Sequence, residues 1–166
     1  MKQYKAQDIR NIALAGHGGD GKTSLAEALL YMSGATDRLG SVTEGNTVCD
    51  FDPEETKRKI SVSSAVAPFE YDGVKVNIID TPGLFDFAGG FYEGVRAADA
   101  VIITLSAKSG VLVGTEKAWK LATAQKKAKA FYVSKMDLEN ADFNKVLAAL
   151  KEKFGNAVCP AVIPVG

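Results

Sequence analysis

The sequence predicts an α/β fold of three layers, in which a mostly parallel sheet carries helices on both faces. Apolar strand-like runs recur along the chain, and helix-spaced apolar residues lie between most of them. A glycine-rich loop joins the first run to the first helical pattern, as in a strand–loop–helix unit. The strand-like runs occupy residues 9–15, 74–79, 100–105, 130–133 and 158–163.

Each element follows from its own pattern. The first strand carries Ile12 and Leu14 on one face. Asp72 and Gly73 are a strong hairpin signal, which predicts that a strand over residues 60–71 pairs with residues 74–79. Helical spacing of apolar residues predicts helices over residues 25–32, 91–98, 118–125 and 143–150, and Gly155 is expected to end the last of them.

One connection is much longer than the others. Residues 34–59 have no sustained period and few large apolar side chains. A loop of this length in a compact domain is usually functional or mobile, so we interpret it as a switch segment.

Composition limits the class of protein. The chain of 166 residues suits one domain, and its 20 basic and 20 acidic residues leave no net charge, so its overall field would not bind nucleic acid or an anionic membrane. Cys49 and Cys159 lack metal spacing and are expected to be reduced. Residues 1–5 have no apolar signal core, and no apolar run reaches the ~18 residues of a membrane span, so we expect a soluble cytoplasmic protein.

Residues 16–23 read Gly-His-Gly-Gly-Asp-Gly-Lys-Thr, an unbroken G-x-x-x-x-G-K-[ST] phosphate-binding loop. Its glycines allow successive backbone N–H groups to converge on an anion, and the following helix N-terminus favours negative charge. Lys22 is expected to reach the β- and γ-phosphates, and the Thr23 hydroxyl is expected to bind Mg²⁺.

Two further motifs follow strands of the predicted sheet. Asp80-Thr81-Pro82-Gly83 places a carboxylate at a strand end, where Asp80 is expected to hold Mg²⁺ and the Gly83 N–H is expected to approach a γ-phosphate. By itself this pattern is equally compatible with a simple proline turn. Because ligand loops gather beyond the carboxyl ends of parallel strands, the loops after the first, third and fifth strands should share one crevice.

The third motif, Ser134-Lys135-Met136-Asp137, indicates which base is bound. The Asp137 carboxylate can accept both N–H groups on the Watson–Crick edge of guanine, which adenine lacks, and the Lys135 stem can cover the base face. The four residues alone are a weak pattern, typical also of a solvated strand-end turn. The order of the three motifs makes the prediction of a guanine nucleotide specific.

With these motifs the chain resembles the small-GTPase superfamily, and within it the translational GTPases most similar to bacterial elongation factor G. Residues 80–87 are similar to that family's Asp-Thr-Pro-Gly-His-x-Asp-Phe, and residues 58–61 to its Arg-Gly-Ile-Thr switch. Residues 52–55, Asp-Pro-Glu-Glu, indicate a divergent branch. The resemblance implies a partial GTP-binding (G) domain over residues 1–166, with switch I at about 34–61 and switch II at about 80–92.

The resemblance also implies the ligands and the site. It implies binding of GTP or GDP with Mg²⁺, GTP hydrolysis, and a ribosome partner reached through the full-length protein, with no membrane and no sequence-specific DNA partner. The catalytic set is Lys22, Gly83 and position 84, and the metal set is Thr23, Ser61 and Asp80. The nucleotide set comprises His17, Gly18, Gly19, Asp20, Gly21, Lys22, Thr23, Ser24, Asp80, Gly83, Ser134, Lys135 and Asp137.

The largest departure from the family is Leu84, which stands where the family has the histidine that positions the attacking water. Leucine forms no hydrogen bond, so this position is expected to be catalytically impaired and intrinsic hydrolysis slow, unless another residue, a monovalent ion or the ribosome substitutes. A second hypothesis is therefore a nucleotide-gated ribosome-binding module with little hydrolysis. A third is a non-guanine P-loop ATPase, in which Asp137 has no role with guanine.

Other departures affect the phosphate loop and the base site. Gly19 stands where the family commonly has Asp, with Asp20 one place later, which either holds the loop or a cation or points to water. His17 is expected to be structural or solvated, and Ser61 keeps the hydroxyl of the family threonine. Ser134 replaces an asparagine, and its shorter side chain is expected to leave the base or the phosphate loop unbraced. Guanine affinity is then expected to be weaker, with the preference for guanine retained through Asp137.

The chain stops soon after its last strand-like run, without the family's fifth guanine-contacting motif and final helix. It is therefore expected to be an N-terminal fragment of the G domain, truncated at the C-terminus. An exposed sheet edge is expected to follow from this.

Overall fold

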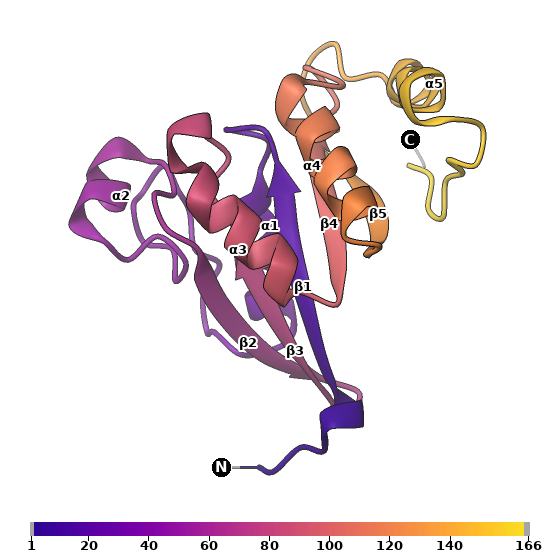
Figure 1. The fold of residues 1–166 in the computed structure, drawn as a ribbon. Coiled ribbons are helices and arrows are strands. Elements are labelled where there is room, and N and C mark those ends of the chain that lie inside the picture. Colours follow the sequence, from indigo (N-terminus) through magenta and orange to yellow (C-terminus); the bar gives the residue numbers. More distant parts are fainter. Residues whose placement is uncertain (1, 165–166) are drawn as a thin grey trace.

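A computed structural model of the chain describes residues 2–164, and it contains a five-stranded sheet in the order β2-β3-β1-β4-β5 (Figure 1). β1 (Ile9–Gly16) lies at the centre and runs parallel to β3 (Val74–Asp80) on one side and to β4 (Ala100–Ser106) on the other. β5 (Ala128–Ser134) extends the parallel set beside β4. β2 (Ala65–Tyr71) pairs antiparallel with β3. The predicted mostly parallel sheet is confirmed.

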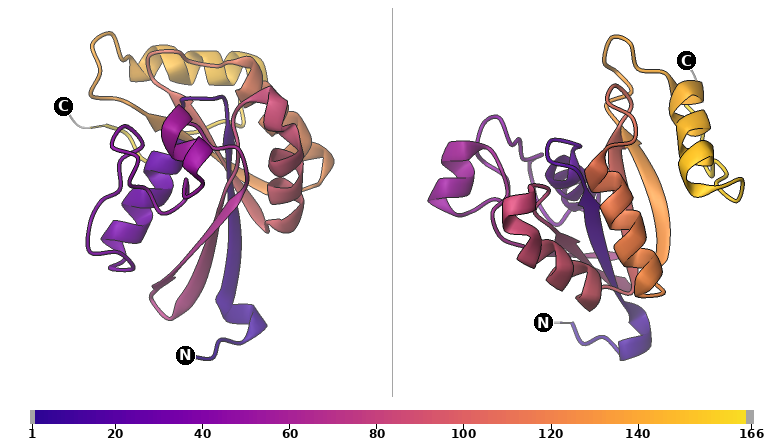
Figure 2. Two further views of the ribbon diagram at one scale, coloured as in Figure 1. Left: turned by 90° about the vertical axis from the view of Figure 1, so that its left-hand side faces the viewer. Right: turned by 45° about the horizontal axis from the view of Figure 1, so that its top comes forward.

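Helices cover both faces of this sheet (Figure 2). α1 (Lys22–Met32) packs on one face, where Leu14 of β1 and Ile78 of β3 meet Ala26 and Leu30. α3 (Ala88–Ala97) and α4 (Val113–Ala124) pack on the other face, against alternate residues of β1 and β4. Because side chains alternate along each strand, one strand supplies both cores. The three-layer prediction is therefore confirmed.

α5 (Phe143–Phe154) packs beyond β5, and its N-cap is Asp142, whose side chain accepts the Lys145 N–H at 3.0 Å. It ends at Gly155, as predicted, where φ is 96°. An aromatic cluster ties it to its neighbours: Trp119 of α4 stacks on Phe131 of β5 at 5.3 Å, and Phe154 packs on Phe131 at 5.1 Å. Side chains from α4, β5 and α5 thus form one aromatic cluster at this side of the sheet.

The Asp72-Gly73 hairpin is confirmed, with left-handed φ values of 47° and 79° at its two central residues. β2 nevertheless begins at Ala65, later than the predicted residue 60. The backbone N–H groups of Val62 and Ser63 bond a carboxylate from the preceding helix, so they are unavailable to a sheet partner. The long connection before them also contains a short helix, α2 (Pro53–Arg58), which a capping box at Asp52 starts.

The predicted strand over residues 158–163 is wrong. These residues are irregular, and Val162 and Ile163 are exposed. Pro160 lies inside the run and supplies no N–H for a sheet ladder, which accounts for the failure of the pattern. The segment instead lines an apolar groove of about 720 Å³ together with β5 and α5.

The carboxyl ends of β1, β3 and β5 lie at one edge of the sheet, opposite the N-terminus of the chain (Figure 1). A short 3-10 turn, η1 (Ala6–Asp8), leads into β1 at the other edge, and a second, η2 (Phe85–Phe87), leads into α3. The predicted motifs follow β1, β3 and β5, so they occupy one edge.

Candidate functional site

The glycine-rich loop joins β1 to α1 in a tight turn. Gly21 is the N-cap of α1 and is left-handed, with φ 86° and ψ 25°, a conformation that glycine adopts without strain. Lys22 is buried and folds back over the loop, where its Nζ donates to the His17 carbonyl at 2.9 Å. Burial lowers the pKa of Lys22, and the charges of Asp80, Asp20 and Asp50 oppose this shift. The loop therefore has a buried cation at its centre, flanked by carboxylates.

The three residues predicted as metal ligands are brought together. The Thr23 hydroxyl donates to Asp80 Oδ2 at 2.7 Å, and it lies 3.2 Å from the Ser61 Oγ. Asp80 Oδ1 is buried and has no hydrogen-bond partner in the described part of the chain. Burial raises the pKa of Asp80 to about 7. Two hydroxyls and an unpaired carboxylate oxygen form the kind of hard oxygen set that Mg²⁺ accepts.

Asp50 also belongs to this cluster, and the sequence motifs did not point to it. This residue is 5% exposed, and its Oδ1 has no hydrogen-bond partner among residues 2–164. Burial raises the pKa of Asp50, while Ser61 and Lys22 oppose this shift. Position 50 lies in a segment without periodicity, so no pattern distinguishes a buried aspartate there from a solvated one.

The loop after β5 braces the phosphate loop. The Ser134 hydroxyl donates to the Asp20 carbonyl at 2.8 Å, and Lys135 Nζ donates to the Gly19 carbonyl at 2.8 Å. The expectation that Ser134 leaves the phosphate loop unbraced is therefore wrong, because the loop approaches β5 closely enough for a short side chain. Asp137 lies beyond β5, is exposed, and makes no side-chain hydrogen bond within the described residues.

Asp20 holds the phosphate loop from within. This residue is 3% exposed, and its Oδ2 accepts the His17 N–H at 3.2 Å. Its burial and this contact argue against a side chain that points to water and support a role in holding the loop. Ser24, on the first turn of α1, is exposed, and no side-chain contact links it to the other site residues within the described chain.

The segment after β3 closes over the phosphate loop. A Cβ on Gly83 would collide with Lys22 Nζ and would lie 2.7 Å from the Gly18 nitrogen, so only glycine fits there in this conformation. A Cβ on Gly18 would lie 2.9 Å from Leu84 Cδ2, so the Leu84 side chain lies against the phosphate loop. Position 84 is therefore near the site but presents only methyl groups to it.

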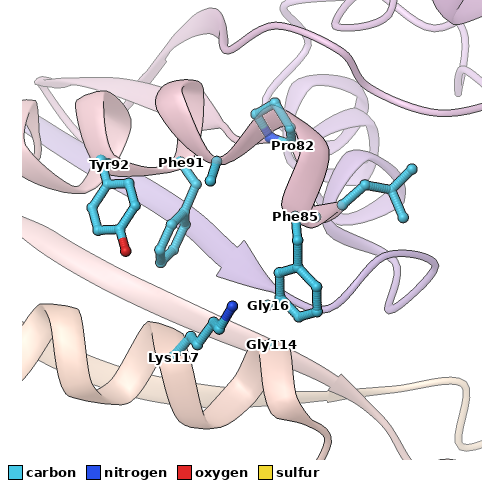
Figure 3. A pocket seen from close by; sticks show the side chains of 10 residues that line it. Gly16, Pro82, Phe85, Phe91, Tyr92, Gly114 and Lys117 are labelled. Carbon is cyan, nitrogen blue, oxygen red and sulfur yellow. The ribbon is translucent and has the colours of Figure 1, made fainter.

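The side chain of the next residue, Phe85, points toward Gly16 and Lys117 (Figure 3). Its ring packs edge-on against His17 at 5.8 Å, and Lys117 Nζ of α4 lies 3.8 Å from its centre. His17 Nδ1 is buried without a partner among the described residues. Pro82, Phe91 and Tyr92 complete the lining of a small cavity of about 60 Å³ between this segment and α4. His17 thus has a structural contact, in line with its expected structural role.

A comparison with protein families identifies the chain. The model of the elongation factor Tu GTP binding domain matches residues 7–164. The chain belongs to this family of GTP-binding domains.

Relatives of this GTP-binding domain include elongation factor G-like proteins. One from Mycobacterium tuberculosis is 42% identical over 158 residues, which is 95% of this chain and 22% of the relative. One from Thermotoga maritima is 39% identical over 160 residues, or 96% of this chain and 23% of the relative. The mitochondrial ribosome-releasing factor 2 of Drosophila willistoni is 37% identical over 153 residues, 92% of this chain and 21% of that protein. The chain thus spans about a fifth of the length of these relatives.

Solved structures agree on the fold. A crystal structure of a Thermus thermophilus protein matches 89% of this chain and 22% of that chain, with a TM-score of 0.86 and 41% identity. A bacterial selenocysteine-specific elongation factor matches with a TM-score of 0.67 and 23% identity, over 89% of this chain and 24% of that one, which supports the fold alone. In residues 2–164 of this domain, no helix has the length and apolar character that crossing a membrane requires.

Proposed function

We propose that this domain binds GTP and GDP with Mg²⁺ and hydrolyses GTP, as the G domain of an elongation factor G-like translational GTPase that acts on the ribosome in the cytoplasm. One observation carries the proposal: the loops after β1, β3 and β5 converge, through the Thr23–Asp80 contact and the contacts of Ser134 and Lys135 with the phosphate loop. A phosphate site, a metal site and a base site are thereby within reach of one nucleotide.

The chain's own groups are suited to the phosphates. Lys22 Nζ already lies over the loop, 2.9 Å from the His17 carbonyl and 3.4 Å from the Gly16 carbonyl, and can exchange these acceptors for phosphate oxygens. Backbone N–H groups at the N-terminus of α1 can donate to the same anion. Gly83 can bring its own N–H to a γ-phosphate because no side chain blocks the approach.

The residues present also fit Mg²⁺. Thr23, Ser61 and Asp80 would hold it, and the unpaired Oδ1 atoms of Asp80 and Asp50 are suited to direct or water-mediated bonds. When bound, Mg²⁺ supplies positive charge that offsets the charge of the β- and γ-phosphate oxygens. Among residues 2–164 no group of three or more His, Cys, Asp or Glu suggests a different metal.

We assign guanine selectivity to Asp137, whose exposed carboxylate forms no hydrogen bond or ion pair within residues 2–164 and is free to accept two N–H groups of the base. Lys135 is left-handed, with φ 58°, and its side chain crosses to Gly19. Its stem is thus suited to lie along the base face. These features disfavour an ATPase, which has no use for a carboxylate at this position.

A second candidate function is favoured by one observation. Leu84 presents methyl groups to Gly18 at the position from which the family histidine would orient water. A nucleotide-gated ribosome-binding module with little hydrolysis would need no such group. In both candidates, switch I spans residues 34–61 and switch II residues 80–92, and both respond to the γ-phosphate.

The test that separates the two candidates is single-turnover hydrolysis of GTP by the full-length protein, with and without ribosomes. A translational GTPase is expected to be stimulated by ribosomes. GTP-dependent ribosome binding without stimulated hydrolysis would support the binding module instead. Absence of both would contradict the ribosomal role of the domain.

A further inference from the structure

Two buried carboxylates outside the nucleotide motifs hold the segment proposed as switch I. Glu27 of α1 is 1% exposed and Glu55 of α2 is 2% exposed. Neither forms an ion pair within residues 2–164. Burying a carboxylate without a cation is costly unless strong hydrogen bonds satisfy it. The hydrogen-bond partners of Glu27 and Glu55 therefore indicate the structural role of these two carboxylates.

Glu27 reaches from the core helix to the first part of the segment. Its Oε1 accepts the Val48 N–H at 2.7 Å and the Cys49 N–H at 3.2 Å. The Cys49 side chain packs into the apolar core beneath α1, so both the backbone and the side chain of residue 49 are fixed. The carboxylate lies so close to Gly40 that a side chain there would collide with it. The next residue along the chain is Asp50.

Glu55 closes the second part of the segment on itself. Its Oε1 accepts the Val62 N–H at 2.9 Å and the Ser63 N–H at 3.0 Å, while its Oε2 accepts the Asp52 N–H at 3.2 Å. One carboxylate thus joins the start of α2 to the two residues that follow Ser61. Because the Val62 and Ser63 N–H groups donate to Glu55, they are unavailable to a neighbouring strand, and β2 begins only at Ala65.

We propose that Glu27 and Glu55 are positioning residues that hold residues 47–63 against α1 and so keep Asp50 buried and Ser61 beside Thr23. This inference rests on the proposed function and adds to it the groups that keep switch I ordered. Asp50 directly follows the backbone held by Glu27, and Ser61 directly precedes the backbone held by Glu55. Ser61 Oγ lies 3.2 Å from Thr23 Oγ1, so both hydroxyls would be available to hold the same cation.

The two carboxylates differ in how many of their oxygens accept hydrogen bonds, so replacing each by an amide should have different effects. Glu55 uses both oxygens as acceptors, so Glu55→Gln must turn an NH₂ group toward a backbone N–H. Glu27 accepts both N–H groups on one oxygen, so Glu27→Gln can keep them, whereas Glu27→Ala cannot. Glu54, next to Glu55 on α2, is exposed and pairs only with the exposed Arg58 within the described chain. Glu54→Gln is therefore the matched control.

The first readout is the affinity for a non-hydrolysable GTP analogue relative to GDP, measured with Mg²⁺ by fluorescence titration. Glu55→Gln and Glu27→Ala are expected to weaken the GTP analogue on the order of tenfold with little change for GDP, because only the triphosphate needs ordered switch I. Glu27→Gln should retain more of the preference than Glu27→Ala, and Glu54→Gln should retain all of it. An unchanged preference in Glu55→Gln, or equal losses for both nucleotides with a lowered melting temperature, would overturn the proposal.

The second readout needs no nucleotide and uses Cys49, whose thiol is buried beneath the segment and whose pKa is raised by burial. In a Cys159→Ser background, alkylation of Cys49 should be slow, and Glu27→Ala and Glu55→Gln should accelerate it on the order of tenfold. Rates equal to that of Glu54→Gln would overturn the proposal. If the unaltered protein binds neither nucleotide, the proposed function fails, and the thiol rates decide alone whether these carboxylates hold the segment.

Discussion

The Thr23 hydroxyl, in the first turn of α1, donates a 2.7 Å hydrogen bond to Asp80 at the end of β3. The two residues are far apart in the sequence, and the parallel pairing of β1 with β3 brings them together. The hydroxyl and the carboxylate are thus held ready around a position that a divalent cation can take.

Thr23→Ala is expected to weaken Mg²⁺-dependent nucleotide binding by about 10- to 100-fold, because a candidate ligand and the partner of Asp80 are both lost. Thr23→Ser keeps the hydroxyl and should bind almost as the unaltered protein does. The measurement is nucleotide affinity over a Mg²⁺ titration. Equal Mg²⁺ dependence in the two variants would show that Thr23 is not a ligand.

Gly83→Ala is expected to abolish tight binding of a GTP analogue, because the added Cβ meets Lys22 Nζ and the Gly18 backbone and must push the loops apart. Gly89→Ala, in α3, is the control, since a Cβ there meets nothing within 4 Å and alanine favours a helix. Affinity and melting temperature should be measured for both. Tight binding by Gly83→Ala would contradict the closed arrangement of the segment after β3.

Leu84→His is expected to raise single-turnover GTP hydrolysis on ribosomes by about 10²-fold, because it restores a side chain that can orient water beside the phosphate loop. Leu84→Ala, which also lacks a hydrogen-bonding group, should not do so. An unchanged rate in Leu84→His would indicate that another group already orients the water.

Asp137→Ala is expected to reduce the preference for GTP over ATP by at least about tenfold, since the charged acceptor for the guanine N–H groups is removed. Glu139→Ala removes a nearby exposed carboxylate and should leave the preference unchanged. Competition titrations with both triphosphates measure the effect. A preference that survives Asp137→Ala would assign base recognition to other groups.

The parts of the fold that repeat a periodic pattern could be predicted from the sequence, and so could the order of the loops at the sheet edge. Gly155 and the Asp72-Gly73 turn were correct because their conformations depend on local backbone freedom. The run at residues 158–163 failed because its apolar composition was weighed above Pro160, which has no N–H to donate to a partner strand.

Side-chain contacts across the site were beyond prediction. The brace from Ser134 to Asp20 depends on how closely two loops approach, which no residue pattern encodes. Asp50, Glu27 and Glu55 were missed for a related reason: carboxylates in a segment without periodicity, or on the polar stripe of a helix, give no sign of being buried.

The most direct test of guanine-nucleotide binding is a titration of the protein, with Mg²⁺, using fluorescent GDP, followed by competition with unlabelled GTP and ATP. Displacement by GTP and not by ATP is the predicted result, and it would show that Asp137 and the phosphate loop form a guanine site. Equal displacement by both, or no binding of the fluorescent nucleotide, would contradict it.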